Sequence, residues 1–126
     1  MRSRGFTLIE LLVVVLVIGV LAAIAIPKFA LTKQRAYVGR LRSDLRNMVE
    51  AQENYFNENG SYAGTASTLF PAFTPSSGTT ITIIEATSGG WSATATGTGV
   101  LHTCAIFYGN AAPVAPAIAE GQVACD

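Results

Sequence analysis

Glu10 is the residue whose position in the sequence most needs a chemical explanation. It lies in an apolar stretch that continues without a polar side chain from Leu11 to Ile26. An ionised carboxylate is costly in hydrocarbon and is usually functional there. We therefore expect Glu10 to have a positively charged partner. The nearest natural one is the amine that would exist at Phe6 if the chain were cut after Gly5.

The apolar stretch is long enough to cross a bilayer. As a helix rising about 1.5 Å per residue, residues 6–26 would extend over roughly 32 Å, close to the thickness of a hydrocarbon core. Fourteen Leu, Ile and Val residues lie between Leu8 and Ile26. Each favours insertion by about 0.3–0.6 kcal/mol, which outweighs the cost of roughly 3 kcal/mol for one carboxylate. The stretch is therefore expected to enter a membrane and to tolerate Glu10.

The start of the chain resembles the processing site and first helix of type IV prepilins, with their class III signal peptide, and of the related pseudopilins. The resemblance is tight over residues 5–30 and rests on general layout beyond them. It implies that a prepilin peptidase removes residues 1–5, that the new amine at Phe6 is methylated, and that Glu10 acts in assembly. The matching features are the short basic leader and the run Arg4-Gly5-Phe6-Thr7-Leu8-Ile9-Glu10-Leu11, followed by Gly19 and Pro27.

The resemblance implies a structural subunit of a type IV pilus, a fimbrium that serves cell adhesion or twitching motility. Such a precursor lies in the inner, cytoplasmic membrane and is then assembled through its N-terminal helix into an extracellular helical filament of identical copies. The implied partners are the prepilin peptidase, a membrane assembly platform and a separate ATPase. The alternative is a pseudopilin of a type II secretion or DNA-uptake (competence) system. Major pseudopilins usually carry a calcium site in an acidic C-terminal loop, whereas residues 109–126 contain only two acidic residues, Glu120 and Asp126, and the cysteine pair fits pilins better.

A more distant alternative is an ordinary signal peptide. Ala23-Ile24-Ala25 offers a small-residue cleavage pattern after an apolar run, which would release a soluble exported binding domain after Ala25. The charged Glu10 inside the run, and the length of the run, argue against this interpretation.

Charge and composition favour a structural role over catalysis. The chain of 126 residues has a formal net charge of zero, and beyond the leader every Lys and Arg lies within residues 28–46. Residues 59–126 therefore lack the basic stripe that contacts to nucleic-acid phosphates need. We find no motif for phosphate binding, metal binding or nucleophilic catalysis, and His102 in a predicted strand is more typical of packing than of a catalytic base. We therefore expect that the protein is not an enzyme and that it binds no cofactor and no metal.

The two cysteines, Cys104 and Cys125, favour one disulfide, because the resemblance places this part of the chain outside the cytoplasm. A zinc site that adds His102 is the alternative, although the spacing matches no familiar pattern.

The first element that the sequence predicts is one long helix, which contains Glu10 near its start. The apolar residues 6–29 form its membrane and assembly half, in which Gly19 and Pro27 indicate either a kink or a place where the helix loosens during assembly. The amphipathic half, residues 30–58, ends at Gly60, which suits a left-handed cap. Arg40 and Asp44 lie four residues apart on its predicted exposed side. Its predicted core stripe is Val38, Leu41, Leu45, Met48, Val49, Gln52, Tyr55 and Phe56.

The remainder of the globular head, which as a whole covers residues 30–126, is predicted to be a small antiparallel sheet of three to four strands. A loop at 60–78 precedes a sheet at 79–108, and the disulfide closes a C-terminal loop over 104–125. The fold class is α+β. Asn59-Gly60-Ser61 matches the acceptor pattern for N-glycosylation, which makes Asn59 a candidate site. The predicted strands are Thr79–Glu85, Trp91–Thr96 and Leu101–Tyr108. In the second, Trp91, Ala93 and Ala95 alternate with Ser92, Thr94 and Thr96, which predicts a half-buried antiparallel strand.

Overall fold

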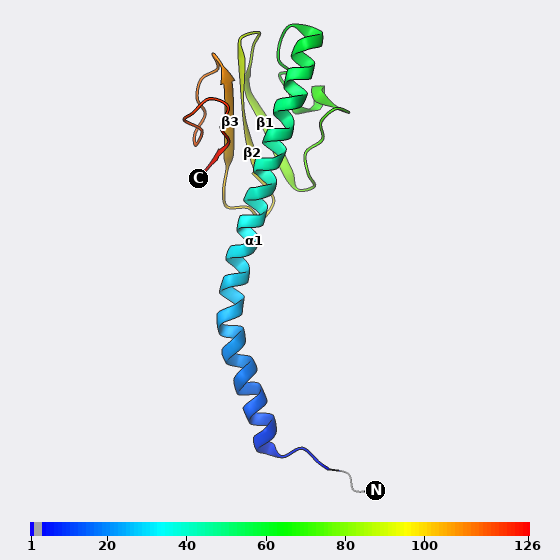
Figure 1. The fold of residues 1–126 in the computed structure, drawn as a ribbon, viewed down its shortest axis with the longest axis vertical. Helices are drawn as coiled ribbons and strands as arrows, with labels where there is room; N and C mark the ends of the chain where they lie inside the picture. Colours follow the sequence, from blue (N-terminus) through cyan, green and yellow to red (C-terminus); the bar gives the residue numbers. More distant parts are fainter. Residues whose placement is uncertain (2–3) are drawn as a thin grey trace. The chain divides into compact units, whose positions relative to one another are not determined.

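The computed structural model describes Met1 and residues 4–126, so residues 2–3 of the predicted leader lie outside the described residues. It consists of one long helix, a short 3-10 helix and four strands (Figure 1). The chain divides into two compact units, Met1–Lys33 and Gln34–Asp126. The elements are α1 (Leu8–Asn59), η1 (Ala66–Leu69), β1 (Thr79–Ala86), β2 (Gly90–Gly97), β3 (Cys104–Gly109) and β4 (Ala124–Cys125).

In the first unit, α1 exposes almost all of its apolar side chains. It begins at Leu8 and contains Pro27 within its span. Among the described residues, α1 is the one helix that is long and apolar enough to cross a membrane, and none of its most apolar window is buried inside the chain. This unit therefore has a large apolar surface that the chain itself does not cover.

In the second unit, α1 buries one face against the sheet. Leu41, Leu45 and Met48 have no exposed surface and form a core with strand residues. This confirms the predicted stripe, because residues three and four apart lie on one face of a helix. The helix ends at Asn59, and Gly60 adopts the predicted left-handed conformation with φ of 71°.

The four strands form one antiparallel sheet in the order β1-β2-β3-β4. This confirms the α+β class and the expected sheet of three to four strands. The two-residue β4 brings Cys125 directly opposite Cys104 at one edge of the sheet. The C-terminal segment that leads to β4 lies alongside β3 (Figure 1).

At Ser92 both faces of the central strand β2 are covered, which differs from the half-buried strand that the sequence predicts, whereas Thr96 on the same face is exposed as expected. Trp91 and the small Ala93 pack into the core shared with α1, as expected from their alternation. Ser92, on the opposite face, is also fully buried. Its partner in β3 is Phe107, which packs against Ala117 of the C-terminal segment. The segment therefore covers, around Ser92, the face that was expected to meet solvent.

The predicted start of the third strand at Leu101 is wrong, because β3 begins at Cys104. A side chain of α1 binds the preceding residues. Gln34 Nε2 donates to the carbonyl of Gly99 at 2.9 Å, and Gln34 Oε1 accepts from the amide of Leu101 at 3.5 Å. These backbone groups are therefore turned toward the helix and do not extend the strand ladder.

Two polar side chains of α1 hold the loop over residues 60–78. Gln52, fully buried within the core stripe, donates to the Ala63 carbonyl at 3.0 Å and accepts from the Ala63 amide at 2.8 Å. Asp44 accepts from the amide of Ser76 at 3.1 Å and from its hydroxyl at 2.7 Å. The placement of Asp44 on the exposed side is wrong, since it is 3% exposed and its carboxylate is satisfied by the loop. The loop also contains one turn of 3-10 helix, η1, which the sequence analysis did not predict.

Candidate functional site

The first turn of α1 is built around a reciprocal cap between Thr7 and Glu10. The Thr7 amide donates to Glu10 Oε2 at 2.8 Å, and the Thr7 hydroxyl donates to the same oxygen at 2.7 Å. In return, the Glu10 amide donates to Thr7 Oγ1 at 3.3 Å. Because α1 begins at Leu8, Thr7 is the N-cap residue and Glu10 the third helical residue. This arrangement is a capping box, which satisfies two amides that a helix start would leave unpaired.

Thr7 is a functional residue that the sequence predictions above do not include, although its signal is present. A Thr followed three residues later by a Glu, directly before an apolar run, is the pattern of such a cap. Glu10 was explained through its charge alone. In the structure, Glu10 also has a structural role, because its hydrogen bonds with Thr7 fix the residue at which α1 begins.

The carboxylate of Glu10 retains capacity for a cationic partner. Both donors from Thr7 are neutral and both reach Oε2. No hydrogen bond within the described part of the chain is formed by Oε1, and the side chain is exposed in the single chain. One oxygen can therefore hold the helix cap while the other accepts from an ammonium group.

The predicted cleavage bond between Gly5 and Phe6 lies in the non-helical segment before α1. Both residues are exposed, Phe6 at 82% of its surface. A Cβ added at Gly5 would meet nothing within 4 Å. Among the described residues, nothing therefore requires glycine at this position. Cleavage would leave the cap intact, because the Thr7 amide belongs to the next peptide bond.

Gly19 and Pro27, the other predicted assembly residues, lie within α1. A Cβ added at Gly19 would also meet open space, so packing inside one subunit does not explain it. Pro27 has no amide hydrogen, which leaves the carbonyl of Ala23 without its helical donor. Both positions weaken the helix within the unit whose apolar surface is uncovered.

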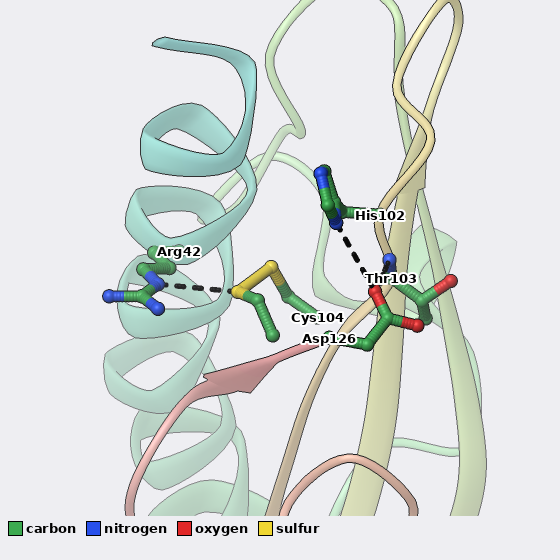
Figure 2. Close-up of a disulfide and its surroundings, with 6 residues drawn as sticks. Arg42, His102, Thr103, Cys104 and Asp126 are labelled. Atoms are coloured by element: carbon green, nitrogen blue, oxygen red, sulfur yellow. Dashed lines mark hydrogen bonds and ion pairs between the residues drawn. A yellow bond between two sulfur atoms is a disulfide. The ribbon is translucent and has the colours of Figure 1, made fainter. Parts of the chain in front are cut away.

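Cys104 and Cys125 form the predicted disulfide. Both sulfurs are used in this bond, which leaves no thiolate for the alternative zinc site. Figure 2 shows the surroundings of the bond, with Arg42 on one side and Asp126 on the other. Asp126 Oδ1 accepts from the Thr103 amide at 2.8 Å and lies 3.7 Å from His102 Nδ1. These contacts fix the last residue beside the start of β3.

Asn59, the candidate glycosylation site, is the last residue of α1 and is exposed. Its side-chain nitrogen, the atom to which an N-linked sugar would be attached, donates to the carbonyl of Tyr55 at 2.9 Å. Asn59 therefore contributes to the end of the helix, where carbonyls lack helical donors.

Comparison with known proteins gives a family model that matches this same region, and several relatives. Residues 1–26 match the prokaryotic N-terminal methylation motif. The type IV major pilin protein PilA of Myxococcus xanthus is 42% identical over 77 residues, which are 61% of this chain and 34% of that protein. The type IV wide pilus major component PilA4 of Thermus thermophilus is 38% identical over 68 residues, 54% of this chain and 52% of that protein.

A third relative belongs to a secretion system. The type II secretion system core protein G of Pectobacterium carotovorum is 36% identical over 64 residues, 51% of this chain and 41% of that protein. The chain thus matches between about a third and about half of the length of these relatives. The motif, the relatives and the helix and sheet described above thus show that this chain is similar to type IV pilins and to the core protein G of type II secretion systems.

Proposed function

We propose that this protein is a structural, non-enzymatic subunit of a type IV pilus filament. The observation that carries the proposal is the uncovered apolar part of α1. From Leu8 to Ile26 the large apolar side chains are each about half exposed or more. Water cannot remain in contact with so much apolar surface without a large free-energy cost. A bilayer covers it in the precursor, and the same helices of neighbouring copies cover it in the filament.

The N-terminal end of the chain also supports processing by a prepilin peptidase. The Gly5–Phe6 bond is exposed and lies outside the helix, within the matched methylation motif. Removal of residues 1–5 creates an amine at Phe6, which is then methylated. The precursor is held in the inner membrane by the apolar half of α1, and the mature subunit passes through a membrane assembly platform into the extracellular filament. The domain limits proposed here are residues 1–5, 6–29 and 30–126.

The proposed role of Glu10 is to pair with the Phe6 amine of the next subunit. A lone carboxylate and a lone ammonium would each be costly in an apolar helix bundle, and their pairing offsets much of that cost. The free Oε1 of Glu10 is the acceptor that we assign to the amine, while Oε2 keeps the Thr7 cap. Because the pair has a fixed reach, it also sets the axial register between subunits.

The second candidate function is that of a pseudopilin, favoured by the similarity to type II secretion core protein G. The C-terminal carboxylates argue for the pilus. Glu120 Oε1 accepts from the Gly109 amide at 2.8 Å, and Asp126 Oδ1 accepts from the Thr103 amide at 2.8 Å. Each carboxylate therefore holds a different backbone segment, which separates the two groups that a calcium site in this loop would need together.

Mass spectrometry of surface fibres tests the proposal. Fibres sheared from cells that carry this gene should contain the chain beginning at Phe6 with one added methyl group. A chain beginning at Ile26 would show an ordinary secreted domain. A strain that lacks only this protein should lose its surface fibres while protein secretion continues. Loss of secretion with fibres unchanged would establish the pseudopilin instead.

A further inference from the structure

The two cysteines of the disulfide contact the same core but differ in exposure. Cys104, in the long strand β3, has no exposed surface and belongs to the core beneath α1. Cys125, in the two-residue strand β4, is partly exposed at the edge of the sheet. A reagent in solution can therefore approach Cys125 and not Cys104.

Cys125 also has a cationic hydrogen-bond donor, which is visible in Figure 2. Arg42, on the exposed face of α1, donates from Nε to Cys125 Sγ at 3.2 Å. Asp126, the acidic residue that follows Cys125 in the sequence, has other partners, since its Oδ1 accepts from the Thr103 amide and lies 3.7 Å from His102 Nδ1. A neighbouring guanidinium favours the thiolate form of a cysteine and lowers its pKa. Burial in an apolar core has the opposite effect, and this is the situation of Cys104.

We propose that Cys125 is the sulfur through which this disulfide is made and broken, and that Arg42 activates it. In formation, the Cys125 thiolate attacks a sulfur of an oxidised dithiol protein, and the second sulfur of that protein leaves as a thiolate. Cys104 then loses its proton to water, and its thiolate attacks Cys125 in the mixed disulfide. The Cys104–Cys125 bond forms and the first sulfur of the oxidant leaves. The oxidant gains the two electrons that the two cysteines lose.

Reduction follows the same path in reverse, and this makes the bond slow to break. An external thiolate reaches Cys125, and Cys104 must leave as a thiolate within the apolar core. Exchange is slower when the leaving thiol has a high pKa. The bond is therefore formed readily in an oxidising compartment, and small thiols reduce it only slowly once the head has folded.

Trapping the exchange in the native protein tests which sulfur is attacked. The full chain in detergent micelles is incubated with reduced glutathione, and the exchange is stopped with acid. The chain is then denatured, its free thiol is alkylated with N-ethylmaleimide, and its peptides are analysed by mass spectrometry. We expect glutathione on Cys125 and maleimide on Cys104. Glutathione predominantly on Cys104, or equally on both residues, would overturn the proposal. This measurement needs no substitution and so does not depend on how a variant folds.

The role of Arg42 is tested with Cys104→Ser, which leaves Cys125 as a thiol. The rate of its alkylation by iodoacetamide is measured between roughly pH 6 and pH 10, a range that spans the ordinary cysteine pKa. Adding Arg42→Gln should raise the apparent pKa of Cys125 and slow alkylation near neutral pH by several-fold, up to about tenfold. Arg46→Gln is the matched control, because Arg46 is an exposed arginine one turn further along α1. Equal rates in the Arg42 and Arg46 variants would remove Arg42 from the proposal.

Discussion

Thr7 and Glu10 hold each other at the start of α1, with the carboxylate of Glu10 accepting both the amide and the hydroxyl of Thr7. The acid that sequence analysis singles out as a charge in need of a partner is thus also part of the helix cap. The two roles use different properties of the side chain. Capping needs an acceptor oxygen, whereas pairing with an amine needs the negative charge.

Substitutions at Glu10 should separate these roles. Glu10→Gln keeps an acceptor for the Thr7 cap and removes the charge, so we expect normal cleavage and helix content but poor incorporation into fibres. Thr7→Ala keeps the charge and should destabilise the helix start by about 1 kcal/mol. The measurements are circular dichroism in micelles and the yield of sheared fibres. Normal fibre yield from Glu10→Gln would mean that the charge has no partner in another subunit.

Replacement of Gly5 by a bulky residue should block processing without disturbing the fold. Gly5→Leu adds a side chain in open space, so the structure gives no reason for misfolding. We expect the uncut precursor to accumulate in the membrane, seen as the larger band on an immunoblot. Gly64→Leu is a control, since a Cβ there also meets nothing within 4 Å. Normal cleavage of the Gly5 variant would contradict the assigned cleavage site.

Gln52→Leu should destabilise the globular head although it makes the core stripe of α1 more apolar. The substitution leaves the amide and carbonyl of buried Ala63 without their partners. Each unsatisfied buried group costs about 1–3 kcal/mol. Urea unfolding can be followed through the fluorescence of Trp91, the single tryptophan of the chain. Unchanged stability in this variant would show that the loop over residues 60–78 finds other partners.

Loss of the disulfide should lower stability by roughly 3 kcal/mol through the greater freedom of the unfolded chain. Replacing Cys104 and Cys125 together by Ala should therefore lower Tm. When the native chain is unfolded, reduced with a strong reductant and refolded, its Tm should decrease by the same amount. The Tm of the variant should not change with the reductant. A variant with native Tm would show that the bond adds little to the fold.

Tyr62 should make the fold sensitive to alkaline pH. Burial and the hydrogen bond from its hydroxyl to Glu53 Oε1, at 3.1 Å, raise the pKa of Tyr62. The folded state therefore holds this proton more tightly than the unfolded state. Its contribution is complete below the ordinary tyrosine pKa of about 10 and is lost as pH rises through the folded-state value. Tyr62→Phe should flatten the decline of Tm in this range, and a decline as steep as that of the native chain would contradict the assignment.

Much of this fold can be predicted because its signals are periodic. The spacing of Leu41, Leu45 and Met48 marks the buried face of α1, and Gly60 marks its end. The alternation around Trp91 predicts the core face of β2. These patterns depend on one element at a time, and for that reason they can be read from one stretch of sequence.

The remaining features depend on contacts between distant residues, which leave no periodic signal. Asp44 is buried because the loop over residues 60–78 brings Ser76 into hydrogen-bonding distance of its carboxylate. The residues before β3 do not pair in the sheet because Gln34 hydrogen-bonds their backbone. Ser92 is buried because the C-terminal segment covers its face of the sheet. The role of Thr7 was not predicted for another reason. Its capping-box pattern is present in the sequence, but the position of Glu10 was already explained by its charge.

The pairing of Glu10 with the Phe6 amine of a neighbouring subunit is best tested by a density map of the assembled fibre at a resolution that shows side chains. The proposal predicts the Phe6 amine of one subunit within about 4 Å of the Glu10 carboxylate of its neighbour, the distance of an ion pair. The Thr7 cap should persist on the other carboxylate oxygen. A map in which the two groups lie far apart, with water beside the carboxylate, would contradict the proposal.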